Sequence, residues 1–265
     1  MNYTLGFIGA GNMAEAIARG AATQGVIEAG RMIAADPTPA RRDVFASFGV
    51  ATATENAQVI RESQTVMLAV KPQTLPALGP VLAQLTDQQV VISIMAGLGS
   101  AKIAAAAGKP LRIVRVMPNT PLMVGQGMAG IALGQGAQPG DDELAMQLFG
   151  ACGQAVRVDE AELDAVTAVS GSGPAYLFYL AEAMQQAADA LGLSAHARTL
   201  VNQTLLGSAT LLADSTDTPA ELRRKVTSPG GTTAAAIAHL DQHHVRDTIA
   251  AALAAARDRS VELGK

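Results

Sequence analysis

The sequence predicts an α/β fold in which a doubly wound, mostly parallel sheet is followed by an all-α C-terminal domain. Over residues 1–160, short runs of β-branched and apolar residues alternate with amphipathic stretches. Such alternation is typical of a mostly parallel sheet with helices on both faces. From about Leu163 the strand pattern stops, and apolar residues recur only at helical spacing. We therefore expect two domains, residues 1–160 and residues 161–265.

Short apolar segments that are rich in β-branched residues and bounded by turn residues predict the strands of the first domain. These strands are Leu5–Ile8, Met32–Ala35, Thr65–Val70, Val90–Ile94, Arg112–Val116 and Met128–Leu133, with Ala155–Val158 as a later addition. Segments with apolar residues at helical spacing lie between the strands. The helices expected there are Met13–Thr23, Pro39–Phe48, Ala57–Glu62, Leu75–Leu85 and Ala101–Ala107.

The second domain is expected to consist of helices alone. Pro174 stands where the first turn of a helix tolerates proline, and apolar residues then recur at helical spacing up to Gly192. Ser194 is expected to cap the next helix. Later helices are expected to open at Asp217-Thr218-Pro219, at Thr232 and at Val245, the last one ending at Leu263. The Ala- and Leu-rich stripes of these helices exceed what one small bundle must bury, which indicates a dimer interface; a monomeric bundle core is the alternative.

The composition argues against several classes of protein. The formal net charge is −4 and the pI is near 5.6, so the chain lacks the basic surface that binds nucleic acid. The N-terminus does not resemble a signal peptide, and no segment offers about 18 uncharged apolar residues, so we expect no membrane partner and a cytoplasmic location. Cys152 is the single cysteine, and the four histidines show no metal-ligand pattern, so we expect neither a disulfide nor a metal site.

A glycine-rich turn follows the first expected strand. In the segment Gly6-Phe7-Ile8-Gly9-Ala10-Gly11-Asn12-Met13-Ala14, the positions of Gly9, Gly11 and Ala14 match the G-x-G-x-x-G/A pattern between a strand and a helix. Gly9 permits the tight turn, and Gly11 lets a pyrophosphate approach the free N–H groups at the helix start. The pattern predicts a Rossmann-type dinucleotide-binding domain. Its expected cofactor contacts in this turn are Gly9, Ala10, Gly11, Asn12 and Met13.

The residues after the second strand leave the choice of dinucleotide open. Asp36 ends this strand, where an acidic side chain usually bonds the adenosine ribose hydroxyls and favours NAD. Thr38, Arg41 and Arg42 follow, and these side chains suit a 2′-phosphate and therefore NADP. A solvated helix face is the alternative for the two arginines.

Three consecutive strands are followed by loops of unusual composition. These loops are Ala69-Val70-Lys71-Pro72, Met95-Ala96-Gly97 and Arg115-Val116-Met117-Pro118-Asn119-Thr120-Pro121. The carboxyl ends of parallel strands share the edge of the sheet at which ligands bind. Taken singly, Lys71 suits a surface position and the prolines suit ordinary turns. Together the loops predict a nicotinamide pocket.

Two small-residue segments in the helical half run into helices. They are Ser170-Gly171-Ser172-Gly173-Pro174-Ala175-Tyr176 and Ser228-Pro229-Gly230-Gly231-Thr232-Thr233. Glycine-rich turns at helix N-termini present backbone N–H groups that hold an anion such as a carboxylate. Ordinary capping by serine and threonine is the alternative for either segment. Two such segments in one half of the chain favour a substrate site.

The segments at 6–13, 69–72, 115–121, 170–176 and 228–233 occur in an order and spacing similar to those of the pyrroline-5-carboxylate reductase family, over essentially the whole chain. The last segment is close to a family signature. The resemblance implies a Rossmann domain, a helical dimerisation domain, and a homodimer or higher oligomer of dimers. It also implies hydride transfer from NAD(P)H to 1-pyrroline-5-carboxylate to give L-proline, the last step of proline biosynthesis. Family members usually prefer NADPH, and some accept NADH.

The resemblance assigns residues to both sites. Beyond the glycine turn, the cofactor-binding residues it implies are Asn56, Ala69, Val70, Lys71, Pro72, Met95, Ala96 and Gly97. Asp36 joins them from its position at the end of the second strand. The substrate-binding residues are Ser228, Gly230, Gly231, Thr232 and Thr233. We expect backbone N–H groups of this loop to hold the substrate carboxylate, and the Thr233 hydroxyl to hydrogen-bond the ring nitrogen as the catalytic contact.

The motif segments contain no histidine, and the reduction of an imine does not require one. A protonated pyrroline is already an electrophilic iminium, so proximity and orientation would supply most of the catalysis, up to about 7–11 kcal/mol in well-aligned cases. A β-hydroxyacid dehydrogenase is the nearest alternative, but it calls for a lysine or histidine between Ser170 and Gly192, where there is none. A non-catalytic sensor of the NADPH/NADP ratio is the other alternative, and it would not need a second anion-binding loop.

Overall fold

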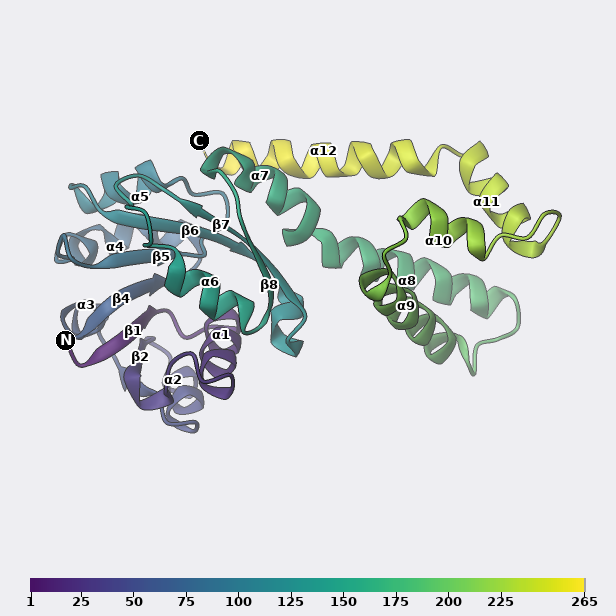
Figure 1. The fold of residues 1–265 in the computed structure, drawn as a ribbon. Coiled ribbons are helices and arrows are strands. Elements are labelled where there is room, and N and C mark those ends of the chain that lie inside the picture. Colours follow the sequence, from purple (N-terminus) through teal and green to yellow (C-terminus); the bar gives the residue numbers. More distant parts are fainter. Residues whose placement is uncertain (265) are drawn as a thin grey trace. The chain divides into compact units, whose positions relative to one another are not determined.

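The computed structural model describes residues 1–264 and divides the chain into two compact units (Figure 1). The first unit contains Met1–Pro174 together with the end of the chain from Ala256 onward. The second unit contains Ala175–Ala255. The sheet lies in the first unit, and the second unit is built of helices.

The strands of the described chain form one eight-stranded sheet in the order β3-β2-β1-β4-β5-β6-β7-β8. Their bounds are β1 Tyr3–Ile8, β2 Met32–Ala35, β3 Ala51–Ala53, β4 Ser63–Leu68, β5 Val90–Ser93, β6 Arg112–Pro118, β7 Gly127–Leu133 and β8 Gly153–Arg157. Neighbouring strands run parallel, except that β6 and β7 pair antiparallel. Strand order reverses beside β1, with β2 and β3 on one side and β4 to β6 on the other. This reversal confirms the doubly wound sheet and marks the edge at which ligands bind.

The structure corrects several strand predictions. β4 ends at Leu68, earlier than predicted. β3 (Ala51–Ala53) is missing from the prediction because three residues are too few to show an alternating pattern. β8 begins at Gly153 rather than Ala155, since the backbone of Gly153 approaches β7 so closely that a Cβ there would lie 2.1 Å from the Gly127 carbonyl oxygen. The residue types near Gly153 do not indicate such a backbone contact, so the sequence does not show where β8 begins.

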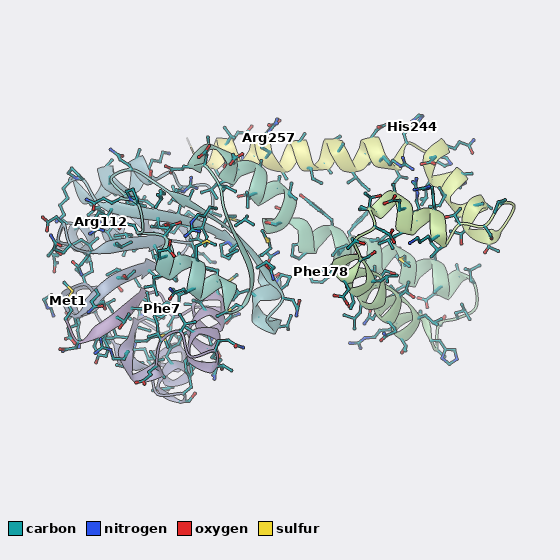
Figure 2. The ribbon with its side chains drawn as sticks, in the orientation of Figure 1. Met1, Phe7, Arg112, Phe178, His244 and Arg257 are labelled. Atoms are coloured by element: carbon teal, nitrogen blue, oxygen red, sulfur yellow. The ribbon has the colours of Figure 1, made fainter. Side chains whose placement is uncertain are left out.

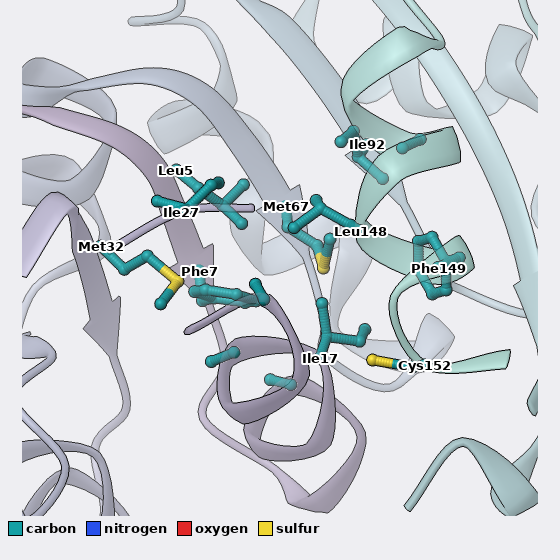
Figure 3. Close-up of a cluster of buried hydrophobic side chains, with 14 of the residues drawn as sticks. Leu5, Phe7, Ile17, Ile27, Met32, Met67, Ile92, Leu148, Phe149 and Cys152 are labelled. Carbon is teal, nitrogen blue, oxygen red and sulfur yellow. The ribbon is translucent and has the colours of Figure 1, made fainter. Parts of the chain in front are cut away.

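Helices cover both faces of the sheet (Figure 1). Their bounds in the first unit are α1 Asn12–Thr23, α2 Pro39–Ala46, α3 Asn56–Glu62, α4 Leu75–Leu82, α5 Ser100–Ala107, α6 Glu143–Gly150 and α7 Leu163–Val166. On one face, Ile17 of α1 and Leu148 of α6 pack in the cluster that includes Phe7 of β1 (Figure 3). On the other face, α3, α4 and α5 contribute to the cluster that includes Ile8 and Leu68. The two faces of β1 therefore carry separate apolar clusters, as a doubly wound sheet requires.

The structure adds a helix, α6, that the sequence pattern does not predict. It has only eight residues, and it follows a stretch rich in glycine and aspartate. Its apolar residues Ala145, Leu148 and Phe149 are buried against the sheet. A helix this short is marginal by itself, so tertiary burial rather than local propensity stabilises it.

The second unit is formed by α8 Gly173–Ala190, α9 Ala197–Asp214, α10 Pro219–Lys225, α11 Thr232–Gln242 and α12 Val245–Leu263, of which α8 begins and α12 ends in the first unit. The predicted cap at Ser194 is wrong, because α9 has His196 at its N-cap. The chain makes a turn before α9, in which the N–H groups of His196 and Ala197 bond the Leu193 carbonyl oxygen at 2.8 and 2.9 Å. Ser194 lies inside this turn and therefore precedes the helix.

Large apolar side chains of the helical unit are exposed in the single chain. Phe178 (labelled in Figure 2), Tyr179 and Leu191 are 68%, 76% and 78% exposed. Extended apolar exposure of this kind marks an interaction surface. Within residues 1–264, no helix combines the length and the apolar character that a membrane span needs.

Candidate active site

The glycine turn after β1 lies between the ends of β2 and β4. The Gly9 N–H donates to the Ala35 carbonyl oxygen at 2.9 Å, and the Ala69 N–H donates to the Ile8 carbonyl oxygen at 2.9 Å. Gly9 has φ +96°, and a Cβ at this position would lie 2.7 Å from the Ala69 carbonyl oxygen and 2.7 Å from Val70 Cγ1. Only glycine fits this conformation and this gap, so the first glycine of the pattern closes the turn against the loop after β4.

Gly11, in the same turn, leaves open space at the N-terminus of α1. It is the N-cap residue of α1 with φ −69° and ψ 176°, and a Cβ built there meets no atom within 4 Å. The space above Gly11 is open, and the N–H groups of the first turn of α1 have no carbonyl partner within the helix. An open approach to uncapped N–H groups fits the pyrophosphate of a dinucleotide.

Asp36, at the end of β2, holds the backbone around this turn. Its Oδ2 accepts a hydrogen bond from the Ala10 N–H at 2.9 Å, and its Oδ1 accepts one from the Thr38 N–H at 2.9 Å. The carboxylate therefore joins the glycine turn to the loop that follows β2. The sequence indicates an acidic residue at a ribose position, but it cannot show that both oxygens already accept backbone N–H groups.

Arg41 and Arg42, at the start of α2, also contact this region. Arg41 Nε donates to the Ala10 carbonyl oxygen at 2.5 Å, and its Nη2 donates to Glu15 Oε2 at 2.9 Å. Arg42 Nη1 donates to the Asp36 carbonyl oxygen at 2.6 Å. Burial alone would raise the pKa of Glu15, but hydrogen bonds from arginines hold this pKa below its ordinary value. A purely solvated helix face is thus wrong for these arginines, because both bond to the backbone beside the glycine turn.

The loops after β4 and β5 lie at the same edge of the sheet. Lys71 is exposed, and Pro72 opens a 3-10 turn, Pro72–Thr74. Met95 is 2% exposed and packs in the core, whereas the next residue, Ala96, is exposed. Both loops therefore follow the carboxyl ends of parallel strands, and the nicotinamide pocket at this edge stays a prediction. Asn56, the first residue of α3, is half-buried.

The end of β6 contacts the first small-residue segment. Asn119 Oδ1 accepts a hydrogen bond from the Met128 N–H at 2.8 Å, and its Nδ2 donates to the Ser170 carbonyl oxygen at 3.1 Å. A Cβ on Gly171 would lie 2.4 Å from Met117 Cε. The small residue at this position therefore permits close packing against the end of β6.

The expectation of a loop at Ser170–Tyr176 is wrong. Residues Thr167–Gly171 form a π-helical turn that leads into α8, and the Ser172 N–H donates to the Thr167 carbonyl oxygen at 2.8 Å. The segment therefore continues helical backbone into α8 and does not form a separate loop before it.

The second small-residue segment, Ser228–Thr233, does form an open helix N-terminus. Gly230 has φ +70°, and the Gly231 N–H donates to the Ser228 carbonyl oxygen at 3.1 Å, so the chain turns directly before α11. No side chain of the described residues caps α11, which has Gly231 as its N-cap. By contrast, Thr218 and Glu221 cap α10 reciprocally in the same unit. Ordinary capping by the threonines of this loop is therefore wrong.

Comparison with known proteins identifies both halves of the chain. Residues 160–263 match the family model described as pyrroline-5-carboxylate reductase dimerisation, and residues 4–97 match the one described as NADP oxidoreductase, coenzyme F420-dependent. The pyrroline-5-carboxylate reductase of Pseudomonas aeruginosa is 43% identical over 98% of this chain and 97% of its own length. The chain belongs to the pyrroline-5-carboxylate reductase family.

Further members of the pyrroline-5-carboxylate reductase family agree with this assignment. The one from Pisum sativum is 41% identical over 99% of this chain and 96% of its own length. A solved structure of a family member from Coxiella burnetii has a TM-score of 0.92 and 36% identity and covers 100% of both chains. The Plasmodium falciparum pyrroline carboxylate reductase, solved with NADP bound, has a TM-score of 0.85 and 30% identity over 100% of this chain and 99% of its own.

Membership of the pyrroline-5-carboxylate reductase family confirms the resemblance and the fold class predicted from the sequence. The chain is an NAD(P)H-dependent oxidoreductase with an N-terminal Rossmann-type domain and a helical dimerisation domain. The dimerisation domain and its exposed apolar side chains support an oligomeric protein.

Proposed function

We propose that this chain reduces 1-pyrroline-5-carboxylate to L-proline, the last step of proline biosynthesis, with NADPH as the preferred hydride donor and NADH as a second one. The observation that carries the proposal is the family match along the whole chain, at 43% identity to a named pyrroline-5-carboxylate reductase. The open N-terminus of α11 supplies a group suited to the carboxylate of this substrate.

Residues 1–160 are assigned to dinucleotide binding, and residues 161–265 to dimerisation and substrate binding. The protein acts as a homodimer or a higher oligomer of dimers in the cytoplasm, without a nucleic-acid or membrane partner. The net charge of −4 and the exposed Phe178 and Tyr179 support this part of the proposal.

The cofactor is assigned to the carboxyl edge of β1, β4 and β5. N–H groups of Gly11, Asn12 and Met13 receive the pyrophosphate, since the space above Gly11 is open. The other residues assigned to cofactor binding are Gly9, Ala10, Asp36, Asn56, Ala69, Val70, Lys71, Pro72, Met95, Ala96 and Gly97. When bound, the dinucleotide supplies hydride from its nicotinamide C4.

The substrate is assigned to the Ser228–Thr233 loop. N–H groups of Gly230, Gly231 and Thr232 hold the carboxylate, and the side chain of Ser228 borders the same turn. The half-buried Thr233 hydroxyl accepts a hydrogen bond from the protonated ring nitrogen, which favours the iminium.

The chain's contribution to the reaction is chiefly orientation. Hydride forms the new C–H bond at the imine carbon, and the electrons of the C=N π bond become the nitrogen lone pair. The nitrogen already carries its proton, so no side chain has to deliver one. A fixed carboxylate and a fixed ring nitrogen leave the imine carbon in one orientation, and such alignment contributes up to about 7–11 kcal/mol.

The test is oxidation of NADPH by the purified protein on addition of racemic pyrroline-5-carboxylate, with L-proline identified as the product. Turnover with NADPH, and slower turnover with NADH, is the expected result. NADPH binding without turnover would instead indicate the non-catalytic sensor.

A further inference from the structure

The last turn of α12 packs on the Met95–Gly97 turn of the first unit. Gly97 has φ +73°, and a Cβ on it would lie 3.3 Å from Leu263 Cβ and 3.5 Å from the Ser260 carbonyl oxygen. On the opposite side of the contact, a Cβ on Gly264 would lie 2.7 Å from the Gly97 carbonyl oxygen. Two glycines thus let the end of the chain approach the backbone of this turn directly.

A buried hydroxyl holds the end of α12 in place. Ser260 is 4% exposed, and its Oγ donates to Asp164 Oδ1 at 2.6 Å. Asp164 belongs to α7, far from Ser260 in the sequence but in the same compact unit. A polar group this deeply buried is costly without a partner, so the hydrogen bond specifies where the last turn of α12 lies.

A second set of hydrogen bonds joins the segment before Asp164 to the start of α5, the helix that follows the Met95–Gly97 turn. Glu160, just before α7, accepts hydrogen bonds from the N–H and the hydroxyl of Ser100, both at 2.7 Å. Arg115 Nη1 lies 3.3 Å from Glu160 Oε1. Ser100 opens α5 three residues after Gly97, so Glu160 fixes the start of the helix that follows the turn. Ser260 and Gly264 lie against Gly97 itself.

We infer that Ser260 and Asp164 are positioning residues for the cofactor, which act through the Met95–Gly97 turn. This inference rests on the cofactor site proposed above. Ala96 is exposed at the carboxyl end of β5, between the buried Met95 and the buried Gly97. Its position therefore depends on what covers Gly97, and the end of α12 provides that cover.

The test compares Ser260→Ala and Asp164→Ala with Asp164→Asn in the full chain. Asparagine retains the acceptor oxygen for Ser260, whereas alanine removes it. We expect both alanine variants to raise the Kd of NADPH about fivefold, because each removes one hydrogen bond. The Kd of NADPH for Asp164→Asn should stay near the wild-type value. The double variant should show the same increase as either single one, because both remove the same bond.

Two further variants separate positioning from stability. Thr248→Ala removes an exposed hydroxyl from the first turn of the same helix and should leave the Kd of NADPH unchanged. Gly264→Ala keeps the Ser260–Asp164 bond but places a methyl group against the Gly97 carbonyl oxygen, so it should raise this Kd even if Ser260→Ala fails to fold.

The readouts are the Kd of NADPH from fluorescence titration, KM and kcat, and the urea midpoint. Lower urea midpoints with an unchanged Kd in Ser260→Ala, Asp164→Ala and Gly264→Ala would overturn the inference. A purely structural role predicts that outcome. Since the titration needs no pyrroline, a wild-type protein that binds NADPH without turnover refutes the proposed reaction and leaves this inference standing.

Discussion

Replacing Gly11 with alanine is expected to weaken NADPH binding while leaving the fold almost unchanged. The backbone of Gly11 (φ −69°, ψ 176°) suits alanine, and the new Cβ meets no atom within 4 Å. The cost to the free protein is the exchange of glycine for alanine at a helix N-cap, about 0.5–1 kcal/mol. The methyl group stands instead in the space through which the pyrophosphate approaches α1.

The magnitude follows from the hydrogen bonds that the methyl group displaces. A hydrogen bond from an N–H to a charged group contributes about 1.5–3 kcal/mol, so the loss of one raises the Kd of NADPH about tenfold to a hundredfold. Fluorescence titration with NADPH measures this Kd, and urea unfolding measures the stability of the same variant.

Gly9→Ala is the matched comparison in the same turn. Its φ of +96° is strained for alanine, at about 1–3 kcal/mol, and contacts of 2.7 Å with the loop after β4 add overpacking of about 1–3 kcal/mol. This variant should therefore lose about 2–6 kcal/mol of unfolding free energy as well as cofactor affinity. An unchanged Kd of NADPH for Gly11→Ala would refute the placement of the pyrophosphate on α1. If the two substitutions lowered the unfolding free energy equally, this result would refute the conclusion that Gly9 closes the turn whereas Gly11 leaves space for the pyrophosphate.

Other predictions concern the substrate loop, the loop after β2, acid stability and assembly. Thr233→Ala should lower kcat/KM for the pyrroline about tenfold to a hundredfold with an unchanged Kd of NADPH, whereas Thr233→Ser should retain activity; unchanged turnover removes Thr233 from the mechanism. Asp36→Ala should raise the Kd of NADPH and lower the urea midpoint, since two backbone N–H groups lose their acceptor. Burial alone would raise the pKa of Asp141, but hydrogen bonds from Arg112 and a backbone N–H hold this pKa below its ordinary value. The stabilisation from Asp141 is therefore complete above about pH 4 and is lost as the pH falls further, so the stability difference from Asp141→Asn in urea should shrink below about pH 4. Phe178→Glu should shift the protein to smaller species in light scattering, because it places a charge on the exposed apolar surface.

Most of the sheet could be predicted because its strands are continuous apolar runs, which a parallel sheet buried on both faces requires. β2 has the predicted bounds, and the carboxyl ends of β4 and β5 carry the predicted loops. β3 could not be predicted because its three residues are too few to display a period. The helix α6 is also missing from the prediction; it is as long as the predicted α5 but follows a stretch rich in glycine and aspartate. Their stability comes from neighbours distant in the sequence, as the burial of Leu148 and Phe149 against the sheet shows.

The candidate site divides in the same way. The glycine turn was predictable because the strand, the turn and the helix that make it are contiguous in the chain. The prediction of a loop at 170–176 is wrong, because small residues suit both an open loop and close packing, and Gly171 packs against Met117. Only the fold distinguishes these two uses.

The sequence by itself determined the order of most strands and helices, the dinucleotide turn and the resemblance to a family of imine reductases. These properties depend on residues close together in the chain, whose spacing reflects local geometry. Only the tertiary structure decided that Asp36 accepts a hydrogen bond from the Ala10 N–H, and that Ser260 bonds Asp164 beside Gly97. Hydrogen bonds between distant segments depend on how the chain packs, and no local pattern of residues encodes them.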